Sequence, residues 1–190
     1  MKLFIYGGSF DPFHIGHELI VNNVLSLCDK LIIVPTNQSP HKSHRPAFNS
    51  KSRYNMLQLM FENNNKIDVS NYELTKANPA FTYDTILHLK SKYKKPNITI
   101  VIGYDLIKGL SSWYRINEIK EEVKFLAYHR NEYNKSQFKD FDISYVEDFN
   151  QSVASSKVRD LLENKKFGTV KPMLPSLIYD YITNKESYQC

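Results

Sequence analysis

Two histidines near the beginning of the chain have the type and spacing of a phosphate-binding pair. His14 and His17 are three residues apart, so a helix that begins here presents both rings on one face of its first turn. The amino terminus of a helix attracts anions through its unpaired N–H groups and its dipole. Gly16 lies between the histidines and keeps that face open to a ligand. The pair therefore predicts a clamp for phosphate groups.

The residues immediately before the histidines predict a loop that a ligand can approach closely. Gly7 and Gly8 follow a short apolar run, and Ser9 and Phe10 continue the loop. Because glycine has no side chain, its backbone can come close to a bound ligand. The pattern G-x-G-x-x-G, which is typical of dinucleotide-binding loops, is absent.

Two other interpretations of the histidines stand beside the phosphate clamp. In the first, one ring caps the helix or packs in the core while the other is solvated. In the second, the histidines bind zinc, with His14, His17, His41 and His44 as ligands. No cysteine or carboxylate lies at a spacing that supports a zinc site. The sequence therefore favours the phosphate clamp over both alternatives.

A second group of anion-binding residues lies far along the chain. Ser155 and Ser156 come just before a helix-like stretch, and we expect one of them to cap that helix. The helix amides, the two hydroxyls and the guanidinium of Arg159 can together hold phosphate groups. An ordinary serine cap followed by a solvated arginine is the alternative. The presence of the histidine pair in the same chain favours phosphate binding.

The elements that must position these residues follow from an alternation of apolar runs and amphipathic stretches. Strands are predicted at residues 3–6, 31–34, 67–69, 98–102, 124–128 and 143–146. Helices are predicted at residues 15–28, 52–61, 82–91, 116–122, 156–162 and 175–183. This alternation predicts an α/β fold, a doubly wound Rossmann-like parallel sheet with helices on both faces, as a single domain over residues 1–190.

In a doubly wound sheet, ligands bind outside the carboxyl ends of the strands, where the winding reverses. We therefore expect the loop with the histidines and the loop after residues 98–102 to face a common site. The second loop contains Gly103 and Asp105, and Trp113 and Tyr114 follow soon after. Both loops are rich in groups that bind ligands, in agreement with the predicted topology.

Composition narrows the class of protein. The 190 residues fit one domain, and the formal charge of +5 suggests an acidic ligand without separating nucleic acid from small phosphorylated molecules. The basic residues are dispersed, with no interleaved aromatic and basic platform for nucleic acid. Cys28 and Cys190 form no C-x-x-C motif, and the apolar start is too short for a signal peptide or a membrane span. We expect a cytoplasmic protein with free thiols and no nucleic-acid or membrane partner.

The two candidate phosphate sites resemble known motifs. Residues 7–17 resemble the signature of the nucleotidylyltransferase superfamily, which shares H-x-G-H with class I aminoacyl-tRNA synthetases. A synthetase is disfavoured because the chain has no room for a tRNA-reading domain and lacks a K-M-S-K-S stretch. Residues 155–159, S-S-K-V-R, are similar to the S-S-x-x-R motif of the adenylyltransferases.

Further stretches resemble the bacterial-type nicotinate-nucleotide adenylyltransferases. Residues 34–42 are similar to V-P-x-x-x-P-P-H-K, residues 73–85 to E-x-x-R-x-G-P-S-Y-T-x-D-T, and residues 103–113 to G-x-D followed by W. The second stretch departs from the family pattern at Lys76, Asn78, Ala80 and Phe81. The resemblance covers nearly the whole chain and is weakest at residues 130–148, where only Arg130 matches.

The resemblance implies a transfer of AMP from ATP to nicotinic acid mononucleotide, with Mg²⁺ held mainly through the ATP phosphates. It implies catalytic roles for His14, His17 and Arg159. The residues implied in ATP binding are Gly7, Gly8, Ser9, Phe10, His14, Gly16, His17, Lys42, Gly103, Asp105, Ser155, Ser156 and Arg159. Those implied in mononucleotide binding are Ser9, His41, Lys42, Thr82, Trp113 and Tyr114.

Several alternatives stay open at the level of the sequence. The second substrate could be nicotinamide mononucleotide, because the Thr82 hydroxyl and the Tyr114 amide can also bind an amide oxygen. Phosphopantetheine is disfavoured because enzymes for that substrate usually have threonine at the position of His14. For Trp113, core packing is the alternative to stacking on a pyridine ring. A basic nucleic-acid-binding module and an inactive nucleotide sensor are alternatives of another class, and a homo-oligomer is compatible with the sequence.

Overall fold

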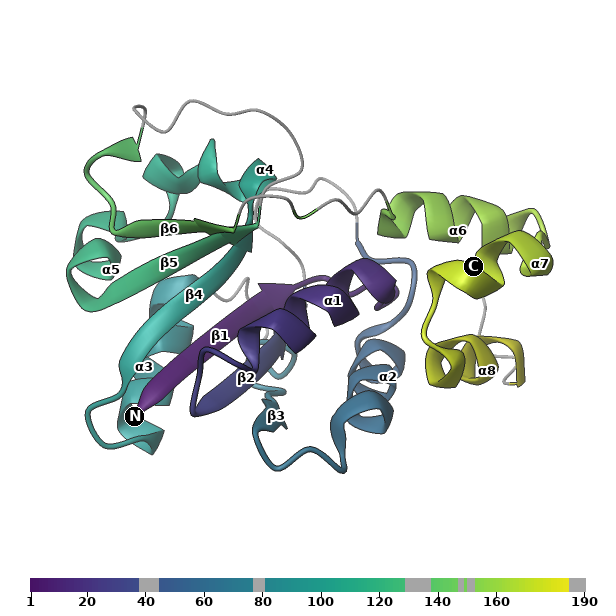
Figure 1. Cartoon of the computed structure of the whole chain (residues 1–190), viewed down its shortest axis with the longest axis horizontal. Helices are drawn as coiled ribbons and strands as arrows, with labels where there is room; N and C mark the ends of the chain where they lie inside the picture. Colours follow the sequence, from purple (N-terminus) through teal and green to yellow (C-terminus); the bar gives the residue numbers. More distant parts are fainter. Residues whose placement is uncertain (38–44, 77–80, 129–137, 147–148, 150–152, 185–190) are drawn as a thin grey trace.

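Six parallel strands form the sheet at the centre of the molecule (Figure 1). The computed structural model describes residues 1–37, 45–76, 81–128, 138–146, 149 and 153–184, with only the backbone of residues 104 and 105. The strands are β1 (Lys2–Gly8), β2 (Lys30–Pro35), β3 (Ile67–Val69), β4 (Asn97–Gly103), β5 (Val123–Tyr128) and β6 (Ile143–Val146). Their order in the sheet is β3-β2-β1-β4-β5-β6.

The winding of the chain reverses between β1 and β4. From β1 the chain builds outward through β2 and β3, then crosses to the other side of β1 and continues through β4, β5 and β6. Gly8 pairs with Pro35 of β2, and Gly103 pairs with Tyr128 of β5, so these strands end at the same edge. The doubly wound fold predicted from the sequence is confirmed, and its switch point lies at the loops after β1 and β4.

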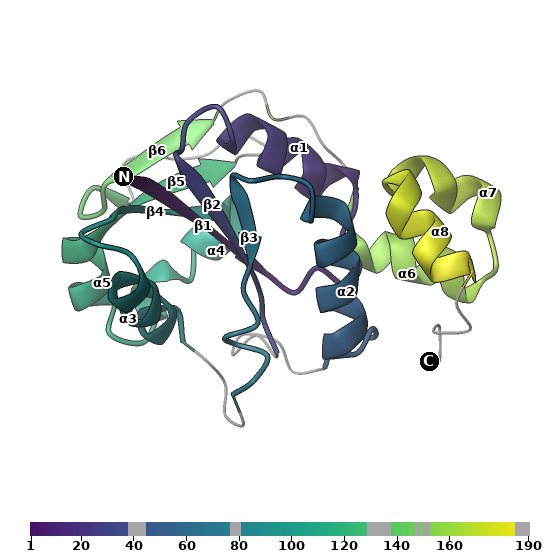
Figure 2. The same ribbon diagram turned by 90° about the horizontal axis from the view of Figure 1, so that it is seen from below.

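Alternate residues of β1 point into two separate cores. Phe4 and Tyr6 pack on the side of α1 (Ile15–Val24) and α2 (Ser50–Phe61). Leu3 and Ile5 pack on the opposite side, where α3 (Thr82–Lys92), α4 (Tyr104–Ile107) and α5 (Ile116–Glu122) lie. Figure 2 shows α3 and α5 together, apart from α1 and α2. The continuous apolar strands of the sequence therefore reflect burial on both faces.

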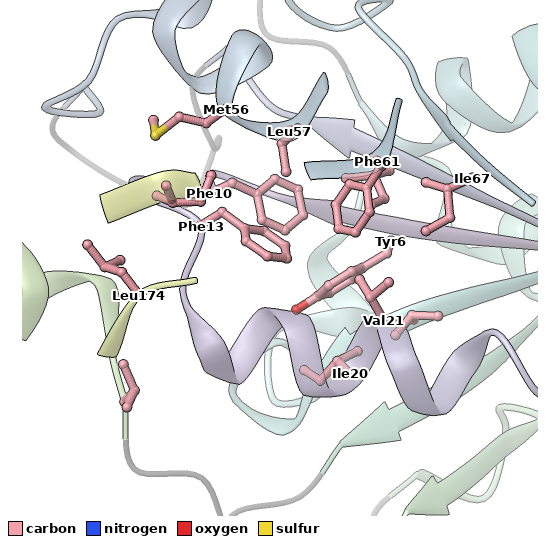
Figure 3. Packing of buried hydrophobic residues seen from close by; sticks show 14 of the residues in the cluster. Tyr6, Phe10, Phe13, Ile20, Val21, Met56, Leu57, Phe61, Ile67 and Leu174 are labelled. Atoms are coloured by element: carbon pink, nitrogen blue, oxygen red, sulfur yellow. The ribbon is translucent and has the colours of Figure 1, made fainter. Parts of the chain in front are cut away.

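The carboxyl-terminal helices extend the first of these cores. They are α6 (Ser155–Glu163), α7 (Phe167–Val170), the 3-10 turn η3 (Lys171–Met173) and α8 (Ser176–Asn184), which group beside α2 in Figures 1 and 2. Leu174 lies with Phe10 and Phe13 in the same apolar cluster (Figure 3). Each large side chain buried there stabilises the fold by roughly 1.5–3 kcal/mol. This packing holds α6 close to the loop after β1.

The six predicted strands and six predicted helices are all present, with small shifts in their bounds. Helix α1 ends at Val24, although the apolar pattern predicted residues 15–28, because Leu25 begins a turn that leads to Asp29. The short elements α4, η1 (Leu110–Ser112), α7 and η3 were not predicted, since three or four residues are too few to show a period. Among the helices that the structure describes, none is long and apolar enough to cross a membrane.

Candidate active site

The two histidines at the start of α1 cap this helix and stack on each other. Nδ1 of His14 accepts a 3.1 Å hydrogen bond from the Gly16 amide, and Nδ1 of His17 accepts one of 3.3 Å from the His14 amide. Because each Nδ1 is an acceptor, the ring hydrogen lies on Nε2. The ring centroids are 3.8 Å apart. Capping thus uses Nδ1 of each ring, and His14 is buried, with 2% of the residue exposed.

Aromatic side chains fix the orientation of His17. The centroid of its ring lies 5.4 Å from that of Phe13, 5.1 Å from that of Phe10 and 6.2 Å from that of Tyr6. Phe10 is buried and has a φ of 46°, a left-handed conformation that its packing must stabilise. A Cβ on Gly8 would lie 3.1 Å from the Phe10 ring. Gly8 therefore makes room for this ring, which is buried, and the predicted ATP contact of Phe10 stays a prediction.

Arg159 reaches from α6 to the loop after β1. Its Nη1 donates a 2.7 Å hydrogen bond to the backbone oxygen of Asp11, which is 148 residues away in the chain, and lies 3.2 Å from Oδ2 of the same residue. The Asp11 carboxylate also accepts hydrogen bonds from the amides of Ala47 (2.9 Å) and Phe48 (2.8 Å). The structure thus brings the predicted arginine to the histidine loop.

The serines of this second motif do not cap α6. The N-cap residue is Ala154, without a side-chain cap, so the predicted serine cap is wrong. Ser155 is the first helical residue, and its hydroxyl donates a 3.2 Å hydrogen bond to the backbone oxygen of Pro12. Ser156 is exposed. A tertiary contact with the loop after β1 therefore replaces the local cap that the sequence indicated.

A buried arginine that the sequence analysis did not single out connects the loops after β1 and β2. Arg53 of α2 is 1% exposed, and its Nη1 donates 2.7 Å hydrogen bonds to the backbone oxygens of Ser9 and Thr36. Its Nε donates to the backbone oxygen of Phe48 at 3.0 Å. Burial lowers the pKa of Arg53, and the nearby carboxylate of Asp11 opposes this effect. Its position three residues before buried Met56 on the helix is the signal that could have found it.

The other side of the switch point brings Thr82 and Tyr114 together. Thr82 is the first residue of α3, and its two neighbours both contact Tyr114. The ring centroid of Tyr114 lies 4.7 Å from that of Phe81 and 6.3 Å from that of Tyr83. The Tyr114 side chain is 51% exposed. The residues on both sides of Thr82 therefore contact the Tyr114 ring, and recognition of the pyridine substituent by the Thr82 hydroxyl and the Tyr114 amide stays a prediction.

Trp113 packs partly against the second core. Its ring centroid lies 6.5 Å from that of Phe125, in an edge-to-face arrangement. The indole Nε1 is buried and has no hydrogen-bond partner among the residues that the structure describes. Core packing, the alternative considered for this residue, is therefore present, and stacking on a ligand ring stays a prediction.

Some predicted site residues lie outside the described part of the chain. These are His41 and Lys42, together with His44 and the side chain of Asp105. Gly103 ends β4, and a Cβ there would meet no atom within 4 Å. Among the described residues, no group of three or more His, Cys, Asp or Glu side chains could hold a metal ion.

Comparisons with known proteins show which proteins this chain resembles. Residues 5–176 match the family model described as cytidylyltransferase-like. A protein of Aliarcobacter butzleri named "Probable nicotinate-nucleotide adenylyltransferase" is 36% identical over 167 residues, which are 87% of this chain and 90% of the relative. A protein of the same name from Hydrogenobaculum sp. is 32% identical and covers 99% of this chain and 98% of its own length.

The fold is also shared with a solved structure. A Plasmodium falciparum nicotinic acid mononucleotide adenylyltransferase complexed with NaAD superposes with a TM-score of 0.80 at 23% identity, over 98% of this chain and 97% of that one. The family model and the two relatives cover most of the chain, and the motifs at His14 and Arg159 lie within the matched residues. The chain therefore belongs to the cytidylyltransferase-like family, and within that family to the nicotinate-nucleotide adenylyltransferases.

Proposed function

We propose that this protein transfers AMP from ATP to nicotinic acid mononucleotide, giving nicotinic acid adenine dinucleotide and pyrophosphate. The observation that carries the proposal is the meeting of two anion-binding groups at one edge of the sheet. Stacked His14 and His17 lie directly after β1, and Arg159 is bonded to the same loop. The histidine pair and Arg159 can each hold a different phosphate of the same ligand, which suits a substrate with several phosphates.

The proposed chemistry requires no nucleophile from the protein. A phosphate oxygen of the mononucleotide attacks the α-phosphorus of ATP in line, and the bond from that phosphorus to the bridging oxygen breaks as pyrophosphate leaves. His14 and His17 donate from Nε2 to the α-phosphate as its negative charge grows. Arg159, with Ser155, Ser156 and the amides of α6, holds the departing pyrophosphate. Positioning and charge neutralisation supply the catalysis.

Mg²⁺ is part of this proposal as a partner of the triphosphate. Mg²⁺ retains several waters and is usually bound through substrate phosphates and few protein ligands. Among the described residues there is no cluster of metal-binding side chains, so the ion is assigned to the phosphates and water. When bound, the ion neutralises charge on the phosphates, and no protein ligand is assigned to it.

The mononucleotide is proposed to bind near Thr82 and Tyr114. A hydroxyl and a backbone amide are donors suited to the carboxylate of the nicotinate ring, and Trp113 offers a flat face for the ring itself. His41 and Lys42 are proposed partners of the mononucleotide phosphate, and Asp105 is a proposed acceptor for ribose hydroxyls. We propose a preference for the acid, because a carboxylate offers acceptor oxygens to both donors, whereas an amide offers a single oxygen.

The cellular setting of the proposal is the cytoplasm. Cys28 is buried and forms no disulfide with another residue that the structure describes. The proposed partners are ATP and the mononucleotide, without nucleic acid. Size-exclusion chromatography with light scattering will determine whether copies of the chain associate.

The experiment incubates the protein with ATP and Mg²⁺ and supplies nicotinic acid mononucleotide or its amide in parallel reactions. Chromatography resolves the dinucleotides, and a coupled assay measures pyrophosphate. Dinucleotide from the acid, with much less from the amide, supports the proposal. Equal rates would reject the roles of Thr82 and Tyr114. Binding of ATP without any product would favour the sensor alternative.

A further inference from the structure

We propose that Asp11 is a positioning residue that holds Arg159 in place for the pyrophosphate group of ATP and couples it to residues 45–49. This inference rests on the proposed function, because that function assigns Arg159 to the pyrophosphate group of ATP. The Asp11 carboxylate itself touches no substrate in this proposal. It acts through the guanidinium that it orients.

The contacts of Asp11 support this role. Asp11 is 5% exposed, and both of its carboxylate oxygens accept backbone amides, Oδ1 from Phe48 and Oδ2 from Ala47. Oδ2 and the Asp11 backbone oxygen both lie within 3.2 Å of Nη1 of Arg159. Bonds to charged groups are about twice as strong as neutral ones, and burial reduces screening by solvent. The carboxylate is therefore held from one side by the backbone while it holds the arginine on the other.

The need for such a residue follows from the arginine. A free arginine side chain has about 2 kcal/mol of rotamer entropy, which a bound phosphate would otherwise have to overcome. Arg159 is partly exposed, with a side-chain exposure of 24%, and its helix begins without a side-chain cap. Contact with Asp11 orients the guanidinium before the nucleotide binds. Because less rotamer entropy is then lost on binding, Asp11 should strengthen the interaction of Arg159 with the polyphosphate.

The same carboxylate connects this arginine to a second part of the site. The amides of Ala47 and Phe48 precede α2, and the backbone oxygen of Phe48 accepts from Arg53. Arg53 in turn donates to the backbone oxygen of Ser9, next to the histidine loop. A continuous set of hydrogen bonds thus joins the loop after β1, the start of α2 and α6. A change at Asp11 is expected to disturb Arg159 most directly.

A double-mutant cycle tests the coupling between the two residues. Asp11→Asn keeps the size of the side chain but removes the charge and one of the two carboxylate acceptors. We expect kcat/KM for ATP to fall about 10–100-fold in Asp11→Asn, and KM for the mononucleotide to change less than about threefold. In the Arg159→Ala background, Asp11→Asn should lower kcat/KM for ATP by less than about threefold more, because the group that it positions is absent.

Asp29→Asn is the matched control. Asp29 also accepts a backbone amide, that of Lys2 at 2.7 Å, but it lies at the opposite edge of the sheet. This variant should leave both KM values unchanged. Losses that multiply independently in the double mutant, or equal losses for ATP and mononucleotide, would show that Asp11 supports the fold alone and would overturn the proposal.

Stability is measured for every variant by urea unfolding. If Asp11→Asn does not fold, Asp11→Glu carries the cycle, because it retains the charge and displaces the carboxylate by one methylene. Calorimetric titration of ATP into the same variants gives a second readout that needs no turnover. A wild-type protein without activity would reject the proposed function, whereas the ATP-binding cycle would still test the coupling of Asp11 to Arg159.

Discussion

The hydroxyl of Thr85 donates a 2.7 Å hydrogen bond to Oε1 of Glu73. Glu73 is 7% exposed, and burial raises its pKa to about 7. The hydrogen bond from Thr85 lowers this pKa, and the charge of Asp84 raises it. One residue before it, Tyr72 stacks on His88 of α3 with a centroid distance of 4.1 Å. These contacts fix the segment after β3 to the helix whose first residue is Thr82.

The raised pKa predicts that stability falls as pH rises. The carboxyl group has a pKa of about 7 in the folded chain and 4.5 as its ordinary value, so the folded state binds the proton more tightly between these limits. The contribution of Glu73 to the free energy of unfolding is full below pH 4.5 and is lost as pH rises through 7, a change of about 3 kcal/mol. Glu73→Gln should remove this dependence, because the amide oxygen still accepts from Thr85.

Urea unfolding at pH 5 and pH 8 measures the effect. The free energy of unfolding of the wild type relative to Glu73→Gln should decrease between the two values. The exposed residue Glu62 has no such environment, so Glu62→Gln serves as the control. Parallel behaviour of the wild type and Glu73→Gln would contradict the prediction.

The two functions of His14 can be separated by substitution. His14→Ser keeps a side-chain oxygen that can cap α1 but removes Nε2, whereas His14→Ala removes both. We expect both variants to lower kcat by about 10²–10³-fold, as observed when one transition-state donor is removed. Both variants lose the buried ring, so the cap is measured by their difference: His14→Ala should be less stable to urea than His14→Ser by about 1 kcal/mol. Near-normal turnover in His14→Ser would contradict a role for Nε2 in the reaction.

The sequence predicted the sheet, the switch point and the histidine loop because each has a local signature. Apolar runs mark the strands, and the spacing of His14 and His17 marks a helix start. The burial of Arg53 and Glu73 was not predicted, because it depends on partners brought together by the fold, such as the backbone oxygens of Ser9 and Thr36 for Arg53 and the Thr85 hydroxyl for Glu73. The cap of α6 was misplaced for a related reason, since Ser155 bonds to Pro12 across the fold.

Arg53→Lys should destabilise the fold although it conserves the charge. A lysine ammonium cannot reproduce the planar set of donors that reaches Ser9, Thr36 and Phe48, and the unpaired carbonyl oxygens would be left in a buried site. We expect a loss of about 2–4 kcal/mol in the free energy of unfolding. Arg115→Lys is the control, because Arg115 is an exposed partner of Glu118 and its replacement should leave the urea midpoint unchanged. Equal midpoints for the two variants would contradict this account.

Alanine in place of two glycines at the switch point should affect stability differently. A Cβ on Gly8 would lie 3.1–3.3 Å from ring atoms of Phe10, which is buried and packed against Phe13 and His17, so the ring cannot move away without disturbing the histidine pair. Gly8→Ala should therefore cost about 1–3 kcal/mol of stability. Gly103→Ala places its Cβ where no atom lies within 4 Å, so we expect a change of less than about 0.5 kcal/mol. Thermal and urea unfolding of both variants measure the difference, and a Gly8→Ala protein as stable as Gly103→Ala would show that the Phe10 ring adapts.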